Sequence, residues 1–372
     1  MKVLYYWLTM GPYHFSRMNA VARQPGVSLA VTEATNLDDH YWQRDGRQHL
    51  FDHHTIFENQ LLDSKVTRRA AHKLIDVVDH IKPDILVNGA GYFDPVLHTR
   101  LRKIKKQNNL RLILWSESTR VDHKRRFWKE QLKKTFLGLY DGAVVAGTPH
   151  RQYLNLLGMQ DAKIQVVGNV VDNQFYQVNQ GEDIQRRGFL YIGRFLDIKN
   201  LDSLLKAYAE YRRQQIDANQ EPHPLYLVGD GPERDSLEQF ISRDNIGGVK
   251  LTGILQPPEV RKMYEQAAVF VLPSISEPWG LVVNEAMASG LPVLVSDRCG
   301  CSKDLVQDGH NGYLFDPFNP KNLADKMVML DKNPKLRSAM GVHARNVISQ
   351  YTPQTYAEKC VQFFQNIQHQ NA

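Results

Sequence analysis

Two glutamates, Glu277 and Glu285, lie on either side of a predicted strand-to-helix turn, with seven residues between them. The apolar run 269–273 predicts the strand. Helix-forming residues follow as far as Gly290, and glycine at that point is typical of a helix end. The spacing therefore places two carboxylates around the carboxyl end of a strand and the helix that begins there.

The turn itself contains Gly280, which leaves the backbone amides of Leu281 and Val282 uncovered. Amides at a helix start attract anions, above all phosphate. Carboxylates beside such a start suit a ligand that carries both phosphate and hydroxyls, as a nucleotide sugar does. A simpler alternative stays open for Glu285, because acidic residues in a first helical turn also complement the helix dipole.

Cations follow the first predicted strand of the second half, 189–192, in the sequence Gly193-Arg194-Phe195-Leu196-Asp197-Ile198-Lys199-Asn200. Arg194 and Lys199 fall in a strand-to-helix loop, with Asn200 as a helix cap. Two cations there could clamp a diphosphate and stabilise it as a leaving group. Ordinary surface charge is the alternative for each of them.

A glycine-rich turn, Gly229-Asp230-Gly231, follows the next predicted strand. Glycines there allow a ligand to approach the backbone closely, and a tight turn alone would also explain them.

Strand-like and helix-like segments alternate along the chain, which predicts an α/β fold with parallel sheets covered on both faces. The clearest helix is 66–80. The predicted strands are 3–7, 27–32, 85–88, 112–115, 143–146, 165–167, 189–192, 225–228, 250–251, 269–272 and 292–295. The segment 36–63 has no clear pattern.

The alternation restarts after a polar stretch, and the length of 372 residues suits two domains. We expect two Rossmann-like domains that face a cleft, with ligands beyond the carboxyl ends of the strands. The expected parts are an N-terminal domain over 1–170, a linker over 171–187, a C-terminal domain over 188–350 and a helix within 351–372 that packs back towards the N-terminal domain.

Composition narrows the class of protein. No run approaches 18 apolar residues, so we expect no transmembrane helix. The three cysteines have neither a disulfide framework nor a zinc-site spacing, and the start of the chain does not resemble a signal peptide, so a cytoplasmic protein is expected.

The net charge of +6 is concentrated in residues 100–134, which hold 13 Lys or Arg against 3 Asp or Glu. Such a cluster can bind anionic lipid, an acidic acceptor or nucleic acid, or can simply be a solvated basic face. Its second part also contains Phe127, Trp128, Leu132 and Phe136, and this amphipathic mixture favours a membrane surface. A peripheral position on the inner face of a membrane is therefore one expectation.

The second half resembles family 4 of the retaining glycosyltransferases (glycosyl transferases group 1), which have the GT-B fold. The resemblance covers about 190–330 and is specific as an ordered set. Its pieces are Gly193-Arg194 with Lys199-Asn200, Val228 to Pro232, Gly253 to Tyr264, Glu277-x7-Glu285 with Ala288 to Val293, and Asp308 to Phe315.

The resemblance implies a role for each matching position. Arg194 and Lys199 would bind the donor diphosphate and, with Glu277 on the sugar hydroxyls, would be the catalytic residues. The remaining donor-binding positions would be Gly193, Gly229, Leu255 near the base, the backbone at Gly280, Leu281 and Val282, and Glu285 on the ribose. No metal or other cofactor is implied, because protein cations and helix amides would neutralise the phosphates of a UDP- or GDP-linked sugar.

The N-terminal half departs from the family pattern. The loop after its first strand has one glycine, Gly11, where a pair is common, and His14 is either structural or an acceptor contact. A histidine usual after a central strand is absent, and Glu117 or Ser118 stands there instead. Trp279, where Phe is usual, could pack on the sugar or fill the core.

The predicted function is retaining transfer of a hexose-type sugar from a nucleoside-diphosphate sugar to a hydroxyl of a glycan, glycolipid or small molecule. A GT-B phosphorylase or sugar epimerase is the second reading, and a catalytically silent scaffold of the same fold is a third. A basic nucleic-acid-binding protein is a remote reading, because the cations lack an RNA-binding aromatic signature or a zinc finger.

Overall fold

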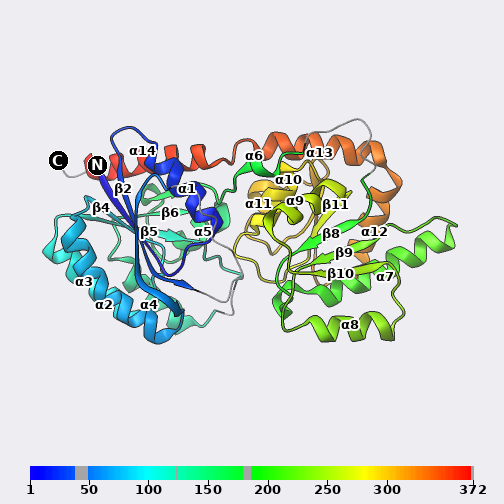
Figure 1. The fold of residues 1–372 in the computed structure, drawn as a ribbon, viewed down its shortest axis with the longest axis horizontal. Coiled ribbons are helices and arrows are strands. Elements are labelled where there is room, and N and C mark those ends of the chain that lie inside the picture. Colours follow the sequence, from blue (N-terminus) through cyan, green and yellow to red (C-terminus); the bar gives the residue numbers. More distant parts are fainter. Residues whose placement is uncertain (38–48, 123–124, 179–185, 370–372) are drawn as a thin grey trace. The chain divides into compact units, whose positions relative to one another are not determined.

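The computed structural model describes residues 1–37, 49–122, 125–178 and 186–369. The chain folds into two compact units, each with its own parallel sheet (Figure 1). The N-terminal unit comprises Met1–Arg120, Lys124–Val171 and Tyr351–Ala372. The C-terminal unit comprises Val121–His123 and Asp172–Gln350.

The N-terminal unit is built on seven parallel strands in the order β3-β2-β1-β4-β5-β6-β7. The strands are β1 Lys2–Trp7, β2 Ser28–Leu37, β3 Asp52–Leu61, β4 Ile85–Asn88, β5 Arg111–Ser116, β6 Gly142–Val145 and β7 Ile164–Val166. The helices are α1 Pro12–Ala22, α2 Ser64–Ile81, α3 Pro95–Gln107, α4 Phe127–Leu137, α5 Thr148–Leu156 and α14 Pro353–His369, with a 3-10 turn at Asp161–Lys163.

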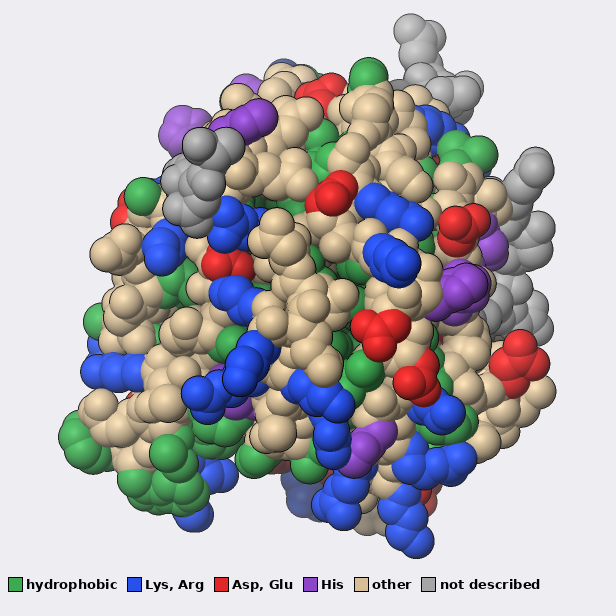
Figure 2. Space-filling model, turned by 90° about the vertical axis from the view of Figure 1, so that its left-hand side faces the viewer, with side chains coloured by type: hydrophobic (Ala, Val, Ile, Leu, Met, Phe, Trp, Pro, Cys, Tyr) green, Lys and Arg blue, Asp and Glu red, His purple; other side chains and the backbone are tan. Residues whose placement is uncertain are grey.

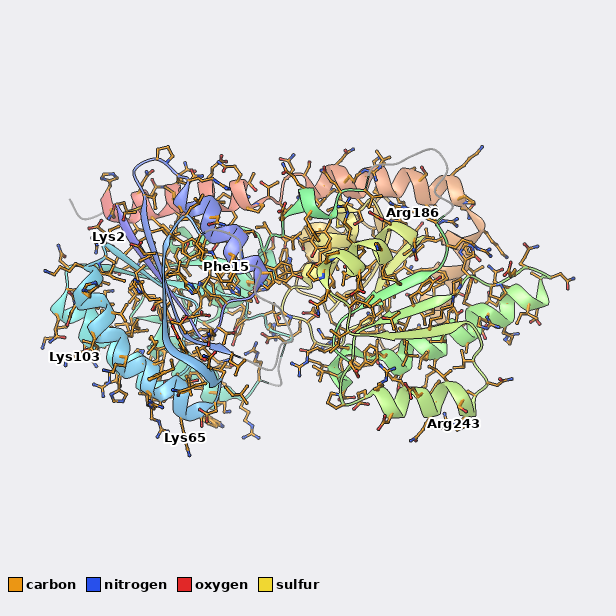
Figure 3. The ribbon with its side chains drawn as sticks, in the orientation of Figure 1. Lys2, Phe15, Lys65, Lys103, Arg186 and Arg243 are labelled. Carbon is orange, nitrogen blue, oxygen red and sulfur yellow. The ribbon has the colours of Figure 1, made fainter. Side chains whose placement is uncertain are left out.

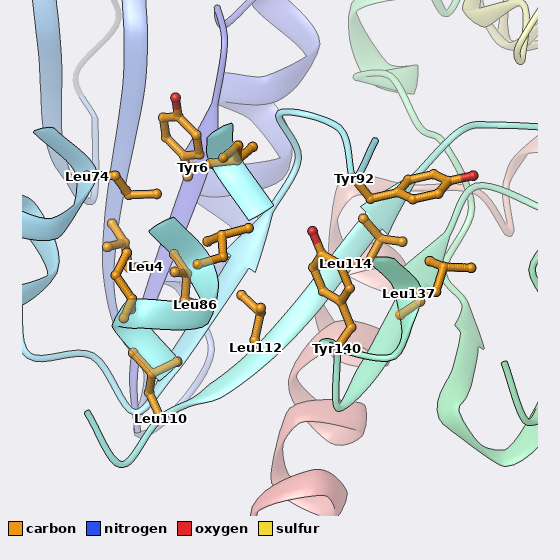
Figure 4. Packing of buried hydrophobic residues seen from close by; sticks show 14 of the residues in the cluster. Leu4, Tyr6, Leu74, Leu86, Tyr92, Leu110, Leu112, Leu114, Leu137 and Tyr140 are labelled. Carbon is orange, nitrogen blue, oxygen red and sulfur yellow. The ribbon is translucent and has the colours of Figure 1, made fainter. Parts of the chain in front are cut away.

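Both faces of this sheet are buried, because successive side chains of a strand point to opposite sides. Leu4 and Tyr6 of β1 belong to the cluster that α2 and α3 cover, shown in Figure 4. Val3, Tyr5 and Trp7 of the same strand belong to the cluster that α1 and α14 cover. This two-sided burial explains why the strands read as continuous apolar runs in the sequence.

Helix α14 is the last element of the chain, and it packs against α1 of the N-terminal unit. Tyr356, Phe363 and Phe364 enter the same core cluster as β1. The indole nitrogen of Trp115 also donates to the hydroxyl of Tyr356 at 3.0 Å. The N-terminal unit therefore contains the two ends of the described chain (Figure 1).

The C-terminal unit is built on six parallel strands in the order β10-β9-β8-β11-β12-β13. The strands are β8 Phe189–Ile192, β9 Leu225–Val228, β10 Val249–Gly253, β11 Val269–Leu272, β12 Val293–Ser296 and β13 Gly312–Phe315. The helices are α6 Asn173–Tyr176, α7 Leu201–Asp217, α8 Arg234–Arg243, α9 Pro257–Gln266, α10 Leu281–Ala288, α11 Ser302–Leu305, α12 Pro320–Lys332 and α13 Pro334–Ile348, with the 3-10 turn η2 at Asp197–Lys199.

The predicted fold class is confirmed, since both sheets are parallel and carry helices between their strands. Each strand predicted from the sequence is present, with ends displaced by a few residues, and the helix predicted over 66–80 is α2. Two strands were not predicted: β3, within the segment 36–63, and β13. Residues 38–48 of that segment lie outside the described residues.

The stretch 171–187, which the sequence suggests is a linker, holds the short helix α6. The hydroxyl of Ser289 on α10 donates to the carbonyl of Tyr176 at 2.8 Å, so α6 is packed into the C-terminal unit. Residues 179–185 lie outside the described part of the chain. The expected cleft concerns the placement of the two domains relative to each other and stays a prediction.

Each strand order reverses direction once, between β1 and β4 in the first sheet and between β8 and β11 in the second. Ligands of open parallel sheets bind beyond the carboxyl ends of the strands at such a switch point. The segments of interest are therefore those that follow these four strands.

Candidate functional site

An ion pair joins the two loops at the switch point of the C-terminal sheet. Lys199 lies at the end of η2, after β8, and Glu277 lies in the loop after β11. The Lys199 Nζ and the Glu277 Oε2 are 2.5 Å apart. Their side chains are 18% and 12% exposed, so both charges are sheltered but reachable from solvent. Two residues predicted to be catalytic are thus brought together.

Asn200 fixes the backbone beside Lys199. It adopts a left-handed conformation, φ 59°, which asparagine tolerates better than most residues. Its side-chain amide donates to the carbonyls of Pro273, at 3.1 Å, and Pro317, at 2.8 Å. Asn200 is the N-cap residue of α7, as predicted, but its side chain makes no capping hydrogen bond and instead ties the loop after β8 to the end of β11.

The loop that carries Glu277 is held from the other side by residues after β12. Gly300 donates its amide to the carbonyl of Glu277 at 2.9 Å, and Cys301 donates to the carbonyl of Trp279 at 3.1 Å. Backbone hydrogen bonds on both flanks therefore position the Glu277 carboxylate before any ligand binds.

Helix α10 begins directly after this loop, with Gly280 as its N-cap in a left-handed conformation, φ 101°. A Cβ atom at Gly280 would lie 2.8 Å from the Cδ2 of Leu272 as well, so both the conformation and the space require glycine. A glycine cap supplies no side chain to the first-turn amides, among them those of Leu281 and Val282. The start of α10 thus has the features of an anion site, and binding of an anion there stays a prediction.

Gly193 and Gly229 have a packing role that the sequence did not reveal. Gly229, with φ 132°, would place a Cβ atom 2.0 Å from the carbonyl oxygen of Gly193. The amide of Gly193 donates to Val228, and the amide of Gly229 donates to the carbonyl of Gly253. The ends of β8, β9 and β10 therefore approach so closely that only glycine fits, and this explains Gly229 without a ligand.

Glu285 is buried, with 1% of its surface exposed. Its Oε2 accepts a hydrogen bond from the Tyr264 hydroxyl at 2.7 Å, and that hydroxyl also lies 3.2 Å from the carbonyl of Val282. The first turn of α10 contains no acidic residue, so the explanation by the helix dipole is wrong for Glu285. Tyr264 lay in a matching sequence piece, yet its contact with Glu285 was not predicted.

Three further predicted positions have different surroundings. Trp279 is 2% exposed and its indole nitrogen donates to Asn284 at 2.9 Å, so it fills the core rather than offering a surface to a sugar. Leu255 is half-buried in the loop after β10. Arg194 is exposed in the loop after β8, and among the described residues no hydrogen bond or ion pair joins it to the Lys199–Glu277 pair.

The negative charge of Glu277 raises the pKa of buried groups around it. Burial raises the pKa of the Cys301 thiol well above its usual range, and the Glu277 carboxylate raises it further. The pKa of the Tyr191 hydroxyl is raised by the same two causes in the same order. These neighbours therefore stay neutral, and neither thiol at 299 or 301 is a nucleophile, because the thiolate is the reactive form.

In the N-terminal unit, Gly11 and His14 form one local structure at the start of α1. The Gly11 amide donates to the Nδ1 of His14 at 3.0 Å, so that nitrogen carries no proton and the proton lies on Nε2. Burial and the Arg17 cation lower the pKa of His14 well below its usual range. The ring packs edge-on against Trp7 at 4.6 Å. His14 is thus a neutral imidazole that caps the helix.

A second network joins three segments at the carboxyl edge of this sheet. Arg17, 1% exposed, donates from Nη1 to the Oδ1 of Asn169 at 2.6 Å. The amide nitrogen of Asn169 donates to the Oε1 of Glu117, which follows β5. The guanidinium also lies over the rings of Trp115, at 5.4 Å, and Tyr356, at 5.8 Å. The Asn169 amide therefore bridges a buried cation and a carboxylate.

Ser118 was predicted together with Glu117. Its backbone amide donates to the Oγ of Ser116 at 3.2 Å, which fixes the backbone next to Glu117. Glu33, not predicted, is fully buried and accepts from the amide of Met10 at 2.9 Å and from Thr55 Oγ1 at 2.9 Å. It fixes the loop before Gly11. The one sequence signal for Glu33 is a charged residue within a mostly apolar strand, and the one for Asn169 is a polar residue shortly after a strand.

The sequence of this chain is similar to those of known glycosyltransferases. Residues 172–347 match the family model described as Glycosyl transferases group 1. An uncharacterized glycosyltransferase of Methanocaldococcus jannaschii is 31% identical over 172 residues, which are 46% of this chain and 45% of that protein. The chain spans less than half the length of the first curated relatives it matches.

Solved structures match over the whole chain at lower identity. Sucrose-phosphate synthase from Thermosynechococcus elongatus has a TM-score of 0.77 at 19% identity, with 99% of each chain covered. The Anabaena protein Alr3699/HepE in complex with UDP-glucose has a TM-score of 0.73 at 17% identity, with 98% of this chain and 100% of that chain covered. These structures share the fold, which is the predicted GT-B fold.

Within the described ranges, no helix has both the length and the apolar character that crossing a membrane requires.

Proposed function

Because its C-terminal unit belongs to the group 1 glycosyl transferases, we propose that this chain transfers a hexose-type sugar from a nucleoside-diphosphate sugar to an acceptor hydroxyl, with retention of anomeric configuration. The acceptor is a hydroxyl of a glycan, glycolipid or small molecule. The Lys199–Glu277 pair beside the start of α10 is the observation that carries the proposal.

The proposed donor fits the chemistry of this edge of the sheet. The diphosphate lies against the Lys199 ammonium, the exposed Arg194 guanidinium and the first amides of α10, which together neutralise its charge without a metal. Glu277 accepts hydrogen bonds from hydroxyls of the sugar. On binding, the ammonium of Lys199 exchanges part of its contact with Glu277 for a phosphate oxygen.

In the proposed reaction, the bond between the anomeric carbon and the phosphate oxygen breaks, and its electron pair goes to the phosphate. The acceptor oxygen bonds to the anomeric carbon on the same face, and its proton passes to the departing phosphate oxygen. Lys199 and Arg194 stabilise the negative charge that develops on this leaving group. Charge stabilisation of this kind acts most strongly in a sheltered site, and the pair is largely buried.

Glu285 keeps its proposed role on the ribose only if its carboxylate exchanges the Tyr264 hydroxyl for ribose hydroxyls. Tyr264→Phe tests this point, because it removes the competing hydroxyl without changing the shape of the ring. Tighter or unchanged binding of the nucleoside diphosphate is expected. A large loss of binding would instead mean that Glu285 acts through Tyr264 to shape the core.

Several relatives in sequence are named as transferases, and this favours transfer over phosphorolysis, epimerisation, scaffolding or nucleic-acid binding. The Anabaena protein was solved in complex with UDP-glucose, so a UDP-linked hexose is the first donor to test here.

The deciding experiment has two stages. Thermal unfolding is measured with a panel of UDP- and GDP-linked sugars, and a cognate donor should raise the midpoint because it binds only the folded protein. The stabilising donor is then incubated with candidate acceptors, and release of free nucleoside diphosphate is followed. Release that requires an acceptor supports transfer. Release of a sugar phosphate from a glycan and inorganic phosphate, with no nucleotide sugar present, would show a phosphorylase instead.

A further inference from the structure

Helix α4, Phe127–Leu137, turns the charged pair Glu130 and Lys133 inward and leaves three large apolar side chains exposed. Phe127 is 80% exposed, Trp128 is 55% exposed and Leu132 is 45% exposed. A helix on the surface of a globular protein normally shows the opposite pattern, with the apolar stripe facing the core. Apolar side chains that gather on one exposed helix face indicate an interaction surface.

The inward face explains why the helix is stable in this orientation. Glu130 and Lys133 form an ion pair of 2.8 Å, and both side chains are less than 20% exposed. The Tyr153 hydroxyl donates to Glu130 at 2.7 Å, and Lys133 lies 2.8 Å from the same hydroxyl. Arg125 stacks on the Tyr153 ring at 4.3 Å. The polar groups on this inward side are therefore satisfied. Leu137 at the end of α4 enters the core, whereas Phe127, Trp128 and Leu132 stay at the surface.

Cations flank the apolar face on both sides. With about 100° between successive residues of an α-helix, Phe127, Trp128 and Leu132 span roughly 140° of its surface. Lys129 lies just beyond Leu132, and Lys134 lies just beyond Phe127 on the opposite edge. Both lysines are exposed, and Lys129 Nζ is 5.4 Å from the Trp128 ring centroid.

The basic surface continues from α4 onto α3. The rings of His98 on α3 and Phe136 on α4 lie 4.3 Å apart, so the two helices are neighbours. Helix α3 contains no acidic residue, and its exposed cations are Arg102, Lys103 and Lys106. Figure 3 shows Lys103 projecting away from the unit, and Figure 2 shows lysine and arginine side chains gathered on the lower part of this face.

We propose that α4 docks on an anionic lipid bilayer, with Phe127, Trp128 and Leu132 entering the interface and the cations of α4 and α3 contacting lipid phosphates. Aromatic and leucine side chains with flanking lysines are the composition that lies in a membrane interface. The sign of the charge selects an anionic rather than a neutral surface. This proposal goes beyond the glycosyl transfer proposed above and does not depend on it.

The experiment is cosedimentation of the full chain with vesicles, without any donor sugar. Equal mixtures of phosphatidylglycerol and phosphatidylcholine are compared with phosphatidylcholine alone, at low salt and at high salt. We expect binding to the anionic vesicles at low salt and release at high salt, because charge at the surface is screened. Equal binding to neutral vesicles, or none to anionic ones, would overturn the proposal.

Two sets of variants separate the apolar and the charged parts. Phe127→Ser combined with Trp128→Ser should weaken binding by about tenfold or more, because two aromatic rings no longer enter the interface. Lys129→Gln and Lys134→Gln should each weaken it by about fivefold. The matched control is Leu156→Ser on α5, which replaces a side chain that is 59% exposed on the same unit and should have no effect.

Folding and self-association are checked on the same samples. All the replaced side chains, apolar and charged, are exposed, so the midpoint of thermal unfolding should not change. Brominated lipid should quench the wild-type fluorescence more than that of Trp128→Phe. The wild type could instead form a dimer that the double serine variant abolishes, while this variant binds vesicles as the wild type does. That result would assign the face to a second copy of the chain and overturn the proposal.

Discussion

The two units place charged side chains differently at the carboxyl edges of their sheets. In the C-terminal unit, the Lys199–Glu277 pair is direct, and both side chains keep 12–18% of their surface exposed. In the N-terminal unit, Arg17 is 1% exposed, and the Asn169 amide bridges it to the Glu117 carboxylate. The first pair can exchange partners with a ligand at little cost, whereas the second holds structure.

This difference separates two ways of building an edge. An ion pair that stays partly exposed can bind a charged ligand, because a ligand can reach the pair from solvent. A fully buried cation must keep its partners, because an uncompensated charge in the core costs several kcal/mol. We therefore expect substitutions of Lys199 or Glu277 to act on chemistry and those of Asn169 or Glu117 to act first on stability.

The largest expected effect is on transfer. Glu277→Gln and Lys199→Ala should each lower kcat by about 100-fold or more, because each removes a polar contact made to the transition state. Initial rates of nucleoside-diphosphate release measure this loss. Glu238→Gln and Lys335→Ala replace exposed side chains of the same unit and serve as controls.

The corresponding N-terminal substitution sharpens the comparison. Glu117→Gln should lower kcat far less than Glu277→Gln does, since its carboxylate is bound to Asn169. Equal losses for the two glutamine variants would show that the N-terminal edge takes part in the chemistry.

The next effect is on the packing of strand ends in the C-terminal unit. Gly229→Ala should reduce the free energy of unfolding by about 3 kcal/mol, because its Cβ atom collides with a backbone carbonyl and its φ is positive. Gly253→Ala is the matched control, since Gly253 also has a positive φ but no atom lies within 4 Å of its Cβ position. Urea unfolding of the two variants measures the difference. Equal destabilisation would mean that backbone conformation alone matters.

Much of the fold could be predicted because its strands are buried on both faces. Continuous apolar runs such as β4 and β11 stand out against the helices around them. Strand β3 lies at an edge and pairs only with β2, so polar residues are tolerated along it and its sequence has no clear pattern. Its place depends on pairing with residues far away in the chain.

The candidate site could be predicted only in part, for a related reason. Lys199, Glu277 and Gly280 stand in local sequence pieces at strand ends, and the structure keeps them together. Arg17 and Asn169 are 152 residues apart, and the hydrogen bond between them follows from the tertiary fold alone. The burial of Glu285 against Tyr264 likewise depends on how α9 packs against α10.

A smaller effect is expected in the bridge of the N-terminal unit. Asn169→Ala should lower the free energy of unfolding by about 1–3 kcal/mol, because it leaves the buried Arg17 guanidinium and the half-buried Glu117 carboxylate without the amide between them. Glu117→Gln should cost less, since glutamine keeps an acceptor oxygen. Urea unfolding measures both, and a larger cost for Glu117→Gln would show that charge, not the hydrogen bond, dominates the bridge.

The smallest effect concerns the pH dependence of stability through His14. Its pKa is lowered in the folded chain, so below the unfolded value of about 6.5 the unfolded state binds a proton that the folded state does not. As the pH decreases below this value, the free energy of unfolding should decrease by up to about 1.4 kcal/mol per pH unit, until the pH reaches the lowered pKa of the folded state. The stability from neutral His14 is therefore present above pH 6.5 and lost as the pH falls.

His14→Gln isolates this contribution, because its side-chain oxygen can still accept from the Gly11 amide but does not titrate. Urea unfolding at pH 7.5, 6.5 and 5.5 should give a shallower loss of stability for the variant than for the wild type. The pKa values of His98 and His223 are also lowered, and these residues contribute equally to both proteins, so the difference in slope belongs to His14. Parallel curves would mean that folding does not lower the pKa of His14. The protonated ring cannot accept from the Gly11 amide, so the start of α1 would have to open, and the N-terminal edge would then be less rigid than the comparison of the two units requires.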